Sequence, residues 1–469
     1  MELLLILLAF CLPAILGAAW INLIVPAATT ARIPVIAGNG ILLGLLVIPL
    51  LMRLLDTISV GLGFPVTASV SSALILLAVL MRVLLGSDEK LAPVPALGYF
   101  ALPKAQKILF LVFVLLSIAH LVAVGIELLG RPLYPFDATM HWATKSRAWF
   151  ETGQIVPFVD NRQWLELDGV GVFTDHHPNY PITIPLLQVW MNSAIGRWDE
   201  SLMNLPWLLC LIGLGMAFYG QARVSGISAM ISIAFTYLLL SMPLINTHVA
   251  LAGYADLFLG YCYCAALMAF HNWTVNRKPW QAVLALVFAI SCTLIKNEGM
   301  YWLLTFFPAL VVVLVPARRA AILLAALLLL LLILLLYIPR DFVMAGHSIN
   351  FLKLGYRPKA LAAIATSFWI HGNWHLFAYL LTGILPLGFA LSKEKISAYR
   401  GIITALASAA ILFLFLFTST RHASGAIRFS SVGRVGIQLV PGILFLLALF
   451  THAIFSRGGT PSVSTASTT

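Results

Sequence analysis

A few charged side chains interrupt an otherwise apolar chain, and these residues are the candidates for chemistry. Asp137 follows Pro135 in RPLYPFDATMHWATKSRAWFETG, and Asp256 lies at the start of the apolar run LAGYADLFLGYCY. Lys296 and Glu298 interrupt another apolar stretch, and Arg434 precedes the last one. A charged group inside a membrane is costly, so such residues are functional candidates by default. Their types suit proton transfer by a carboxylate and anion binding by a cation.

Each of these residues also has a structural interpretation. A carboxylate at Asp137 would cap a helix over 137–151, where the helix dipole favours negative charge. Lys296 and Glu298 would pair with each other in a turn between two helices. Cations near the ends of spans commonly anchor a helix at the membrane surface. Both interpretations stay open at this stage.

The segment 131–181 is the longest part of the chain that could not lie in a lipid core, and it holds six of the 17 acidic residues. If 137–151 is helical, Asp137 and His141 share one face, with Lys145 beside it. The segment ends in His176 and the element His177-Pro178-Asn179-Tyr180-Pro181. Two adjacent histidines lack the i, i+4 spacing of a helical metal site, so they are a weak metal signal.

Composition defines the class of protein that must position these residues. The chain has 469 residues, of which 61% are hydrophobic and only 10% charged, with a mean hydropathy of +0.98. Apolar runs of about 20 residues recur, long enough to cross a hydrocarbon core. We therefore expect an all-α polytopic membrane protein. Its net charge of +11 fits cytoplasmic loops and a phosphate site better than nucleic acid. The five cysteines lie in apolar runs, which argues against disulfides or zinc.

About thirteen apolar runs are predicted to span the membrane. The N-terminal run lacks the basic residues of a signal peptide, so we count it as a retained span. The predicted spans are 3–25, 34–54, 64–86, 107–129, 203–222, 227–246, 254–272, 281–296, 299–316, 319–338, 374–391, 401–418 and 435–454.

The distribution of Lys and Arg predicts which connections face the cytoplasm. Five cationic connections fall on one side if the apolar segment 182–196 is an interfacial or re-entrant helix that does not cross. The loops 131–202, 339–373 and 419–434, the turn around Asp256 and the junction Lys296–Glu298 then share the outer side. The loops 339–373 and 419–434 carry cations that suit an anionic lipid headgroup, namely Arg340, Lys353, Arg357, Lys359, Arg421, Arg428 and Arg434.

The arrangement resembles the GT-C glycosyltransferases, and most closely their bacterial protein-mannosyltransferase and aminoarabinose-transferase branch. The resemblance covers roughly 107–300, where Asp137 matches the loop acid, Asp256 the second acid, and His177–Pro181 the proline-rich element. Ala138 stands where the family often has Glu, and Asn179 replaces a proline. The resemblance implies a GT-C-like bundle of about 13 transmembrane helices whose large outer loop carries interfacial helices.

The predicted domains follow from this comparison. Residues 1–106 would form additional transmembrane helices. The catalytic module would span 107–338 and include the outer loop 131–202. Residues 339–456 would form C-terminal helices with cationic outer loops, and 457–469 a disordered tail.

The resemblance implies transfer of a sugar from a polyprenyl-phosphate donor to an extracytoplasmic lipid, glycan or protein, in a bacterial inner membrane with the site facing the periplasm or the exterior. Asp137 would be the general base and Asp256 the second catalytic acid, and direct displacement would invert the anomeric centre. Both carboxylates could hold Mg²⁺ or Mn²⁺. The other assignments are phosphate binding by Lys296, Arg357 and Arg434, and substrate binding by His141, Lys145, His176, His177, Tyr180 and Glu298.

Other functions would use the same charged residues. A transporter or flippase for a lipid-linked or anionic solute is the main alternative, but it would be expected to show internal symmetry and broken helices in matching halves. A lipid-linked glycan ligase or polymerase would share the donor chemistry. A noncatalytic scaffold would give no reason for buried acids.

Overall fold

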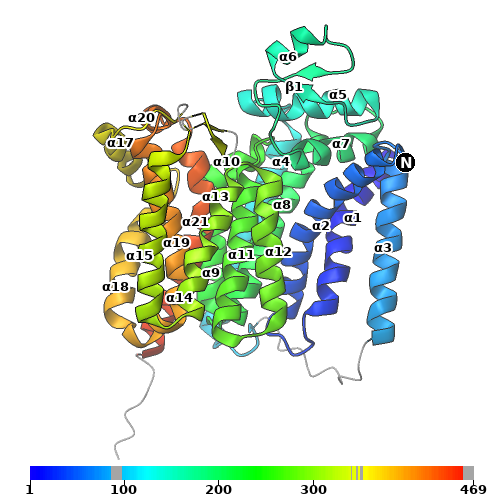
Figure 1. Cartoon of the computed structure of the whole chain (residues 1–469). Helices are drawn as coiled ribbons and strands as arrows, with labels where there is room; N and C mark the ends of the chain where they lie inside the picture. Colours follow the sequence, from blue (N-terminus) through cyan, green and yellow to red (C-terminus); the bar gives the residue numbers. More distant parts are fainter. Residues whose placement is uncertain (86–97, 340, 345–346, 349–351, 458–469) are drawn as a thin grey trace, which may run out of the picture.

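The chain folds into a bundle of helices that run between two ends of the molecule (Figure 1). The structure is a computed structural model, and it describes residues 1–85, 98–339, 341–344, 347–348 and 352–457. The helices of the bundle are α1 (Glu2–Ile24), α2 (Arg32–Thr57), α3 (Phe64–Leu85), α4 (Lys104–Leu129), α8 (Leu205–Val224), α9 (Ala229–Leu240), α10 (Pro243–Ala250), α11 (Asp256–Asn276), α12 (Pro279–Ile295), α13 (Gly299–Leu304), α14 (Phe306–Leu314), α15 (Ala317–Tyr337), α18 (Phe377–Leu391), α19 (Lys393–Ser419) and α21 (Val432–Arg457).

Eight helices of the described residues are long and apolar enough to cross a membrane, or nine if the bent pair α9 and α10 is one span. The prediction of an all-α polytopic membrane protein is therefore confirmed. Three further apolar helices, α12, α13 with α14, and α18, are shorter. The count of about thirteen spans stays a prediction. Arg340 and the tail beyond Arg457 lie outside the described residues.

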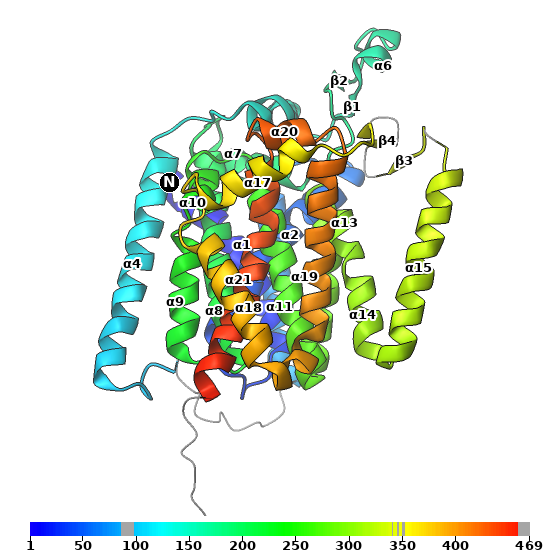
Figure 2. The same ribbon diagram turned by 90° about the vertical axis from the view of Figure 1, so that its left-hand side faces the viewer.

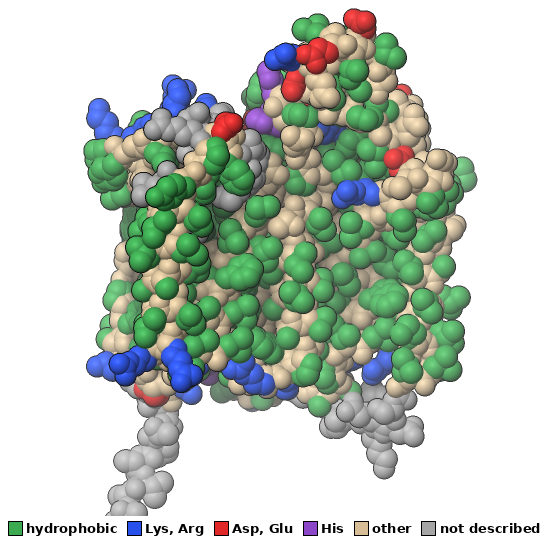
Figure 3. Space-filling model, viewed as in Figure 1, with side chains coloured by type: hydrophobic (Ala, Val, Ile, Leu, Met, Phe, Trp, Pro, Cys, Tyr) green, Lys and Arg blue, Asp and Glu red, His purple; other side chains and the backbone are tan. Residues whose placement is uncertain are grey.

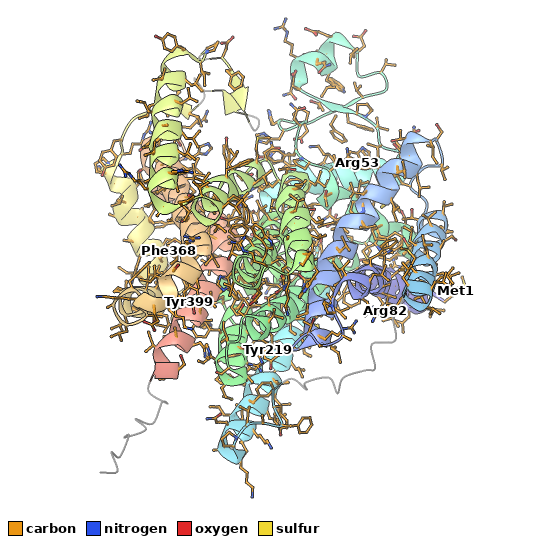
Figure 4. All side chains as sticks on the ribbon, turned by 60° about the horizontal axis from the view of Figure 1, so that its bottom comes forward. Met1, Arg53, Arg82, Tyr219, Phe368 and Tyr399 are labelled. Atoms are coloured by element: carbon orange, nitrogen blue, oxygen red, sulfur yellow. The ribbon has the colours of Figure 1, made fainter. Side chains whose placement is uncertain are left out.

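Burial separates the inside of the bundle from its periphery. Every residue of α11 from Asp256 to Asn272 is buried, which makes this helix the centre of the bundle. By contrast, leucines such as Leu323 and Leu328 of α15 are more than half exposed, because a helix that is apolar all round can face lipid. Figure 4 shows side chains filling the space between the helices, with Tyr399 of α19 labelled; its ring packs against those of His271 and Phe450.

One end of the bundle, called here the loop end, carries most of the short elements (Figures 1 and 2). An arm formed by residues 157–175 projects from this end. In the arm β1 pairs in parallel with β2, and α6 connects the two strands along the chain. β3 and β4 form an antiparallel pair. The short elements are η1 (Ala138–Ala143), α5 (Thr144–Thr152), β1 (Phe158–Val159), α6 (Asn161–Glu166), β2 (Phe173–Thr174), α7 (Thr183–Ile195), η2 (Leu202–Asn204), β3 (Val343–Met344), β4 (His347–Ser348), α17 (Pro358–Trp369) and α20 (Ala423–Ile427).

Helix α7 corresponds to the apolar segment 182–196, which we predicted not to cross. In Figure 1 it lies across the loop end, whereas the long helices run along the bundle. Twelve of its thirteen residues are buried, against α1, α2 and α5 among others. The segment is therefore apolar because it packs beneath α5, and its 13 residues are too few to span a hydrocarbon core.

Lys and Arg side chains gather along the edge of the molecule opposite the loop end (Figure 3). The junctions between bundle helices at that end include Arg277-Lys278, which precede α12, and Arg318-Arg319 in the first turn of α15. The described residues of the predicted outer segments lie together at the loop end, as the sidedness prediction requires. Which end faces the cytoplasm stays a prediction.

Candidate functional site

The carboxylate of Asp256 is the centre of a buried ion-pair network near the loop end. Asp256 is the first residue of α11 and is fully buried. Its Oδ1 accepts hydrogen bonds from Lys296 Nζ at 2.9 Å and from Gln438 Nε2 at 2.6 Å. Its Oδ2 accepts one from Arg434 Nε at 3.1 Å. Three donors, two of them cationic, offset the cost of removing this charge from water.

Lys296 reaches Asp256 because the chain breaks between α12 and α13. The backbone of Lys296 is extended, with φ −157° and ψ 152°, so α12 ends before it. Gly299 then begins α13 so close to α12 that a Cβ atom there would lie 1.9 Å from the carbonyl oxygen of Cys292. Only glycine fits this approach. The break places Lys296 Nζ inside the protein, where it also lies 2.9 Å from Glu298 Oε1.

Arg434 joins the two carboxylates that the sequence analysis selected. It lies in the first turn of α21, where its Nη1 donates to Asp137 Oδ2 and its Nε to Asp256 Oδ2. The guanidinium also lies over the ring of Tyr254, 4.2 Å from the ring centre, in a cation–π contact. The planar fork of arginine suits such a bridge because its N–H groups point in fixed directions.

Close packing of α11 against α21 sets the distance between these residues. A Cβ atom at Gly260, one turn after Asp256, would lie 2.6 Å from the carbonyl oxygen of Ile437. The two helix backbones therefore touch at Gly260, as small residues allow in membrane bundles. Gln438 follows Ile437 and is thereby brought within hydrogen-bond distance of Asp256.

Asp137 is the most exposed of the three acids of the network, ahead of Glu298 and Asp256. It immediately precedes the π-helix η1, but its side chain makes no capping hydrogen bond. The carboxylate turns to Arg434 instead, so the structure does not show the helix-capping alternative. The side chain of Asp137 is 37% exposed, whereas that of Asp256 is fully buried.

A cavity of about 180 Å³ lies beside Asp137 and Arg434. Part of its lining is polar and charged, and part is apolar and comes from α19, α21 and Leu352. The cavity therefore suits a molecule with both a polar and an apolar part. The lining residues are Asp137, Tyr180, Lys296, Asn297, Glu298, Tyr301, Leu352, Leu416, Phe417, His422, Ser431, Arg434 and Val435.

The charges of the network alternate in sign along one path. Glu298 pairs with Lys296, Lys296 with Asp256, Asp256 with Arg434, and Arg434 with Asp137. Three carboxylates and two cations leave one net negative charge when all are ionised. Each cation is shared by two acids, so the network can hold a carboxylate in one orientation at the cavity wall.

A second cluster forms around Asp175 at the base of the arm. Asp175 Oδ1 lies 2.7 Å from His141 Nδ1, and its Oδ2 lies 2.9 Å from Lys145 Nζ. Lys145 also donates to the backbone oxygen of His177 at 2.7 Å and is only 1% exposed. Burial alone would raise the pKa of Asp175, but the hydrogen bonds from Lys145 and His141 hold that pKa below its usual value. Lys145 thus fastens the arm and does not line the cavity.

Tyr180 connects the second cluster with the cavity. Its ring stacks on that of His177, with centres 4.6 Å apart and planes 5° apart, and on that of Trp142 at 5.1 Å. Tyr180 itself lines the cavity. Burial, together with the nearby Glu298, raises the pKa of Tyr180 to about 12. The phenol therefore stays neutral at physiological pH and can donate a hydrogen bond to a ligand.

The position of Asp175 predicts how the arm responds to pH. The folded pKa of Asp175 is depressed, so its contribution to stability is present above the unfolded value of about 3.9 and is lost as pH falls through the folded pKa. We expect residues 158–175 to lose amide protection below about pH 4. Hydrogen exchange, corrected for the intrinsic pH dependence, measures this.

The same experiment has a matched control within the arm. Asp175→Asn should loosen residues 158–175 already at pH 7, whereas Asp168→Asn, at an exposed position, should leave protection unchanged. Equal protection in wild type and Asp175→Asn at pH 7 would show that the cluster does not hold the arm.

Five of the predicted ligand residues do not line the cavity, namely His141, Lys145, His176, His177 and Arg357. Of these, His176 is exposed. Arg357 donates to three backbone oxygens, those of Gly355 at 3.0 Å, Thr420 at 2.6 Å and Lys353 at 3.2 Å. In the described part of the chain its guanidinium therefore ties two loops together. Its predicted phosphate contact gains no support from this placement.

The residues around Asp137 and Asp256 do not fit a divalent ion shared by the two acids. The guanidinium of Arg434 lies between their carboxylates, and both oxygens of Asp256 accept hydrogen bonds from Lys296, Gln438 or Arg434. A hard cation needs oxygen ligands where these N–H donors stand. Within the described residues there is also no group of three or more His, Cys, Asp or Glu arranged to hold a metal.

Sequence reasoning missed two partners of the network, Gln438 and Tyr254. Gln438 follows Arg434 by four residues, a spacing that places both on one helix face, so a signal for it was present. Tyr254 precedes Asp256 by two residues, and nothing in its spacing indicates a contact with Arg434. Asn297 and Tyr301 flank the predicted Glu298 and line the cavity with it.

Fold and site together define an all-α membrane protein with a buried ion-pair network beside a cavity at its loop end. Comparison of the chain with protein-family models, with curated proteins and with solved structures finds no match.

Proposed function

We propose that this protein is a membrane glycosyltransferase that moves a sugar from a polyprenyl-phosphate donor to an extracytoplasmic acceptor. The observation that carries the proposal is the cavity, whose lining combines the partly exposed carboxylate of Asp137 with the cations Arg434 and Lys296 and with apolar residues. A lipid-linked sugar has the same division into an apolar chain, an anionic phosphate and a polar sugar.

Asp137 is the proposed general base. Its carboxylate is the most exposed of the three in the network and lines the cavity, and Arg434 holds it in place. A base contributes most when it is oriented toward the proton before the reaction begins. With one base and direct displacement of the phosphate, the anomeric centre would invert.

Arg434 and Lys296 are the proposed phosphate ligands. Arg434 donates to the two acids through Nε and Nη1, and a guanidinium has five N–H groups. Within the described contacts it therefore has donors left for a phosphate oxygen. Negative charge grows on the phosphate as the glycosidic bond breaks, so these donors would stabilise the transition state more than the bound donor lipid.

The orientation of the protein is part of the proposal. Cationic junctions lie opposite the loop end (Figure 3), and such junctions usually stay in the cytoplasm. The cavity would then face the outside, which in a bacterial inner membrane is the periplasm. The cations of the loop end, such as Lys353 and Arg421, would lie near anionic headgroups.

Transport of a lipid-linked solute is the second candidate function. The pair α9 and α10 bends by 53° at a break, and broken helices often line transporter sites. Reconstituted vesicles containing a fluorescent polyprenyl-phosphate sugar separate the two functions. A transporter moves the label between leaflets without an acceptor, whereas a transferase releases polyprenyl phosphate only when an acceptor is present.

Deletion of the gene provides the broadest test. We expect mass spectrometry of envelope glycans to show one sugar missing from one class of lipid, glycan or protein, and the intact polyprenyl-phosphate sugar to accumulate. Both changes should revert when the wild-type gene is restored. Unchanged glycans together with an unchanged donor pool would contradict the proposal.

A further inference from the structure

Gln438 occupies a central position in the network that none of the proposed chemical roles uses. It lies on α21 and is fully buried. Its Nε2 donates to Asp256 Oδ1 at 2.6 Å, and its Oε1 accepts from Trp302 Nε1 at 2.6 Å. Trp302 is 3% exposed and lies on α13, just after the chain break that carries Lys296. Three helices thus meet at one amide group.

The indole of Trp302 decides which way this amide points. An amide has an acceptor oxygen and a donor nitrogen that occupy almost the same space, so it could offer either to a neighbour. The indole nitrogen can only donate, and it therefore takes the amide oxygen. The amide nitrogen must then face Asp256. In the opposite orientation the amide oxygen would face the carboxylate oxygen of Asp256, and the amide nitrogen would face the indole N–H. Two acceptors would then oppose each other, as would two donors, and in a buried position this is costly.

We propose that Gln438 is a positioning residue that fixes the carboxylate of Asp256 and, through it, Arg434. With Oδ1 held by Gln438 and Lys296, Oδ2 of Asp256 is presented to Arg434 Nε. Arg434 in turn holds Asp137 at the cavity wall. The geometric role of Gln438 stands without the glycosyltransferase proposal; only its effect on transfer rests on that proposal.

A second carboxyl at position 438 would expose this role. Gln438→Glu keeps the size of the side chain but places a carboxyl within hydrogen-bond distance of Asp256. Two carboxylates this close cannot both be ionised and would share one proton. The charged and titratable groups around the pair are Lys296 from the α12–α13 junction, Arg434 from α21, Asp256 itself from α11 and His248 from α10.

The first readout is the melting temperature of the purified protein as a function of pH, which needs no substrate. We expect Gln438→Glu to melt close to wild type near pH 5 and progressively below it toward about pH 9, because the shared proton stabilises the folded state and leaves as pH rises. Gln438→Leu, of similar size and without a titrating group, should show a constant deficit. A constant deficit in Gln438→Glu would overturn the proposal.

The second readout is sugar transfer by variants of the Trp302–Gln438 pair. Trp302→Phe removes the indole donor and should lower the transfer rate by about 10- to 100-fold, as loss of an orienting group does elsewhere. Because the buried amide oxygen then lacks a donor, the melting temperature should also fall, by the same amount at every pH. If Gln438→Glu does not fold, the Trp302→Phe variant still tests the proposal. Wild-type transfer by Trp302→Phe would overturn the proposal. Absence of transfer by the wild-type protein would count against the proposed function alone, and the melting experiment would then decide the role of Gln438.

Discussion

Asp137→Asn is expected to lower sugar transfer by about 10²- to 10⁴-fold, the range that a general base contributes. The amide oxygen of Asn can still accept the hydrogen bond from Arg434, so the shape of the cavity should persist. The amide cannot take a proton from an acceptor hydroxyl. Initial rates with a purified polyprenyl-phosphate sugar, together with donor binding measured separately, should show lost turnover with retained binding.

Glu151→Gln is the matched control for this variant. Glu151 belongs to the same outer loop and also pairs with an arginine, but its partner Arg147 and the acid itself are about half exposed. Removing that charge should leave transfer within about twofold, because exposed ion pairs contribute little. Normal turnover by Asp137→Asn would exclude Asp137 as the base, whatever the control does.

The apolar runs predicted the helices because length and hydropathy alone define a span. The run 34–54 lies inside α2 (Arg32–Thr57), and 435–454 inside α21 (Val432–Arg457). The run 227–246 was predicted as one helix, yet it falls on α9 and α10. Pro243 begins α10, and a proline lacks the N–H that a continuous helix would need at this point. Hydropathy does not register such a break, because proline leaves the run apolar.

The charged residues predicted the site for a related reason. Asp137, Asp256, Lys296, Glu298 and Arg434 stand out because apolar surroundings make each charge costly, and the structure brings all five together. The sequence did not predict which acid pairs with which cation, because three acids and two cations can be paired in several ways. Arg357 and Arg434 looked equivalent in the sequence, because both are cations of predicted outer loops. In the structure the guanidinium of Arg357 is occupied by backbone oxygens, and such contacts cannot be predicted from the sequence.

Local geometry explains a further difference around Asp137. A regular α-helix over 137–151 would place Asp137 and His141 on one face. The structure has a π-helix at Ala138–Ala143, whose wider turn changes that relation. Asp137 faces Arg434, whereas His141 faces Asp175. The residues that the sequence placed on one helix face therefore belong to two separate clusters, one around Asp256 and one around Asp175. Tyr180, which lines the cavity, connects them.

Asp256→Ala is expected to destabilise the protein by about 3–5 kcal/mol, the cost of removing one partner from a buried ion pair. The variant removes the common acceptor of Lys296, Arg434 and Gln438, and a water in its place would not carry the negative charge of the carboxylate. Equilibrium unfolding in mild detergent measures the difference. Glu127→Ala is the control, because it removes an acid from a pair of similar length with Arg131 in which both side chains are about half exposed. That change should cost no more than about 1 kcal/mol.

A double variant separates the charge of Asp256 from its volume. In Asp256→Ala/Lys296→Met one of the two cations that lost Asp256 is replaced by an apolar side chain of similar length, so part of the lost stability should return. The double variant should therefore be more stable than Asp256→Ala, although each change alone destabilises. If Asp256→Ala costs no more than Glu127→Ala, or if the two changes simply add, then the network does not stabilise the fold through its charges.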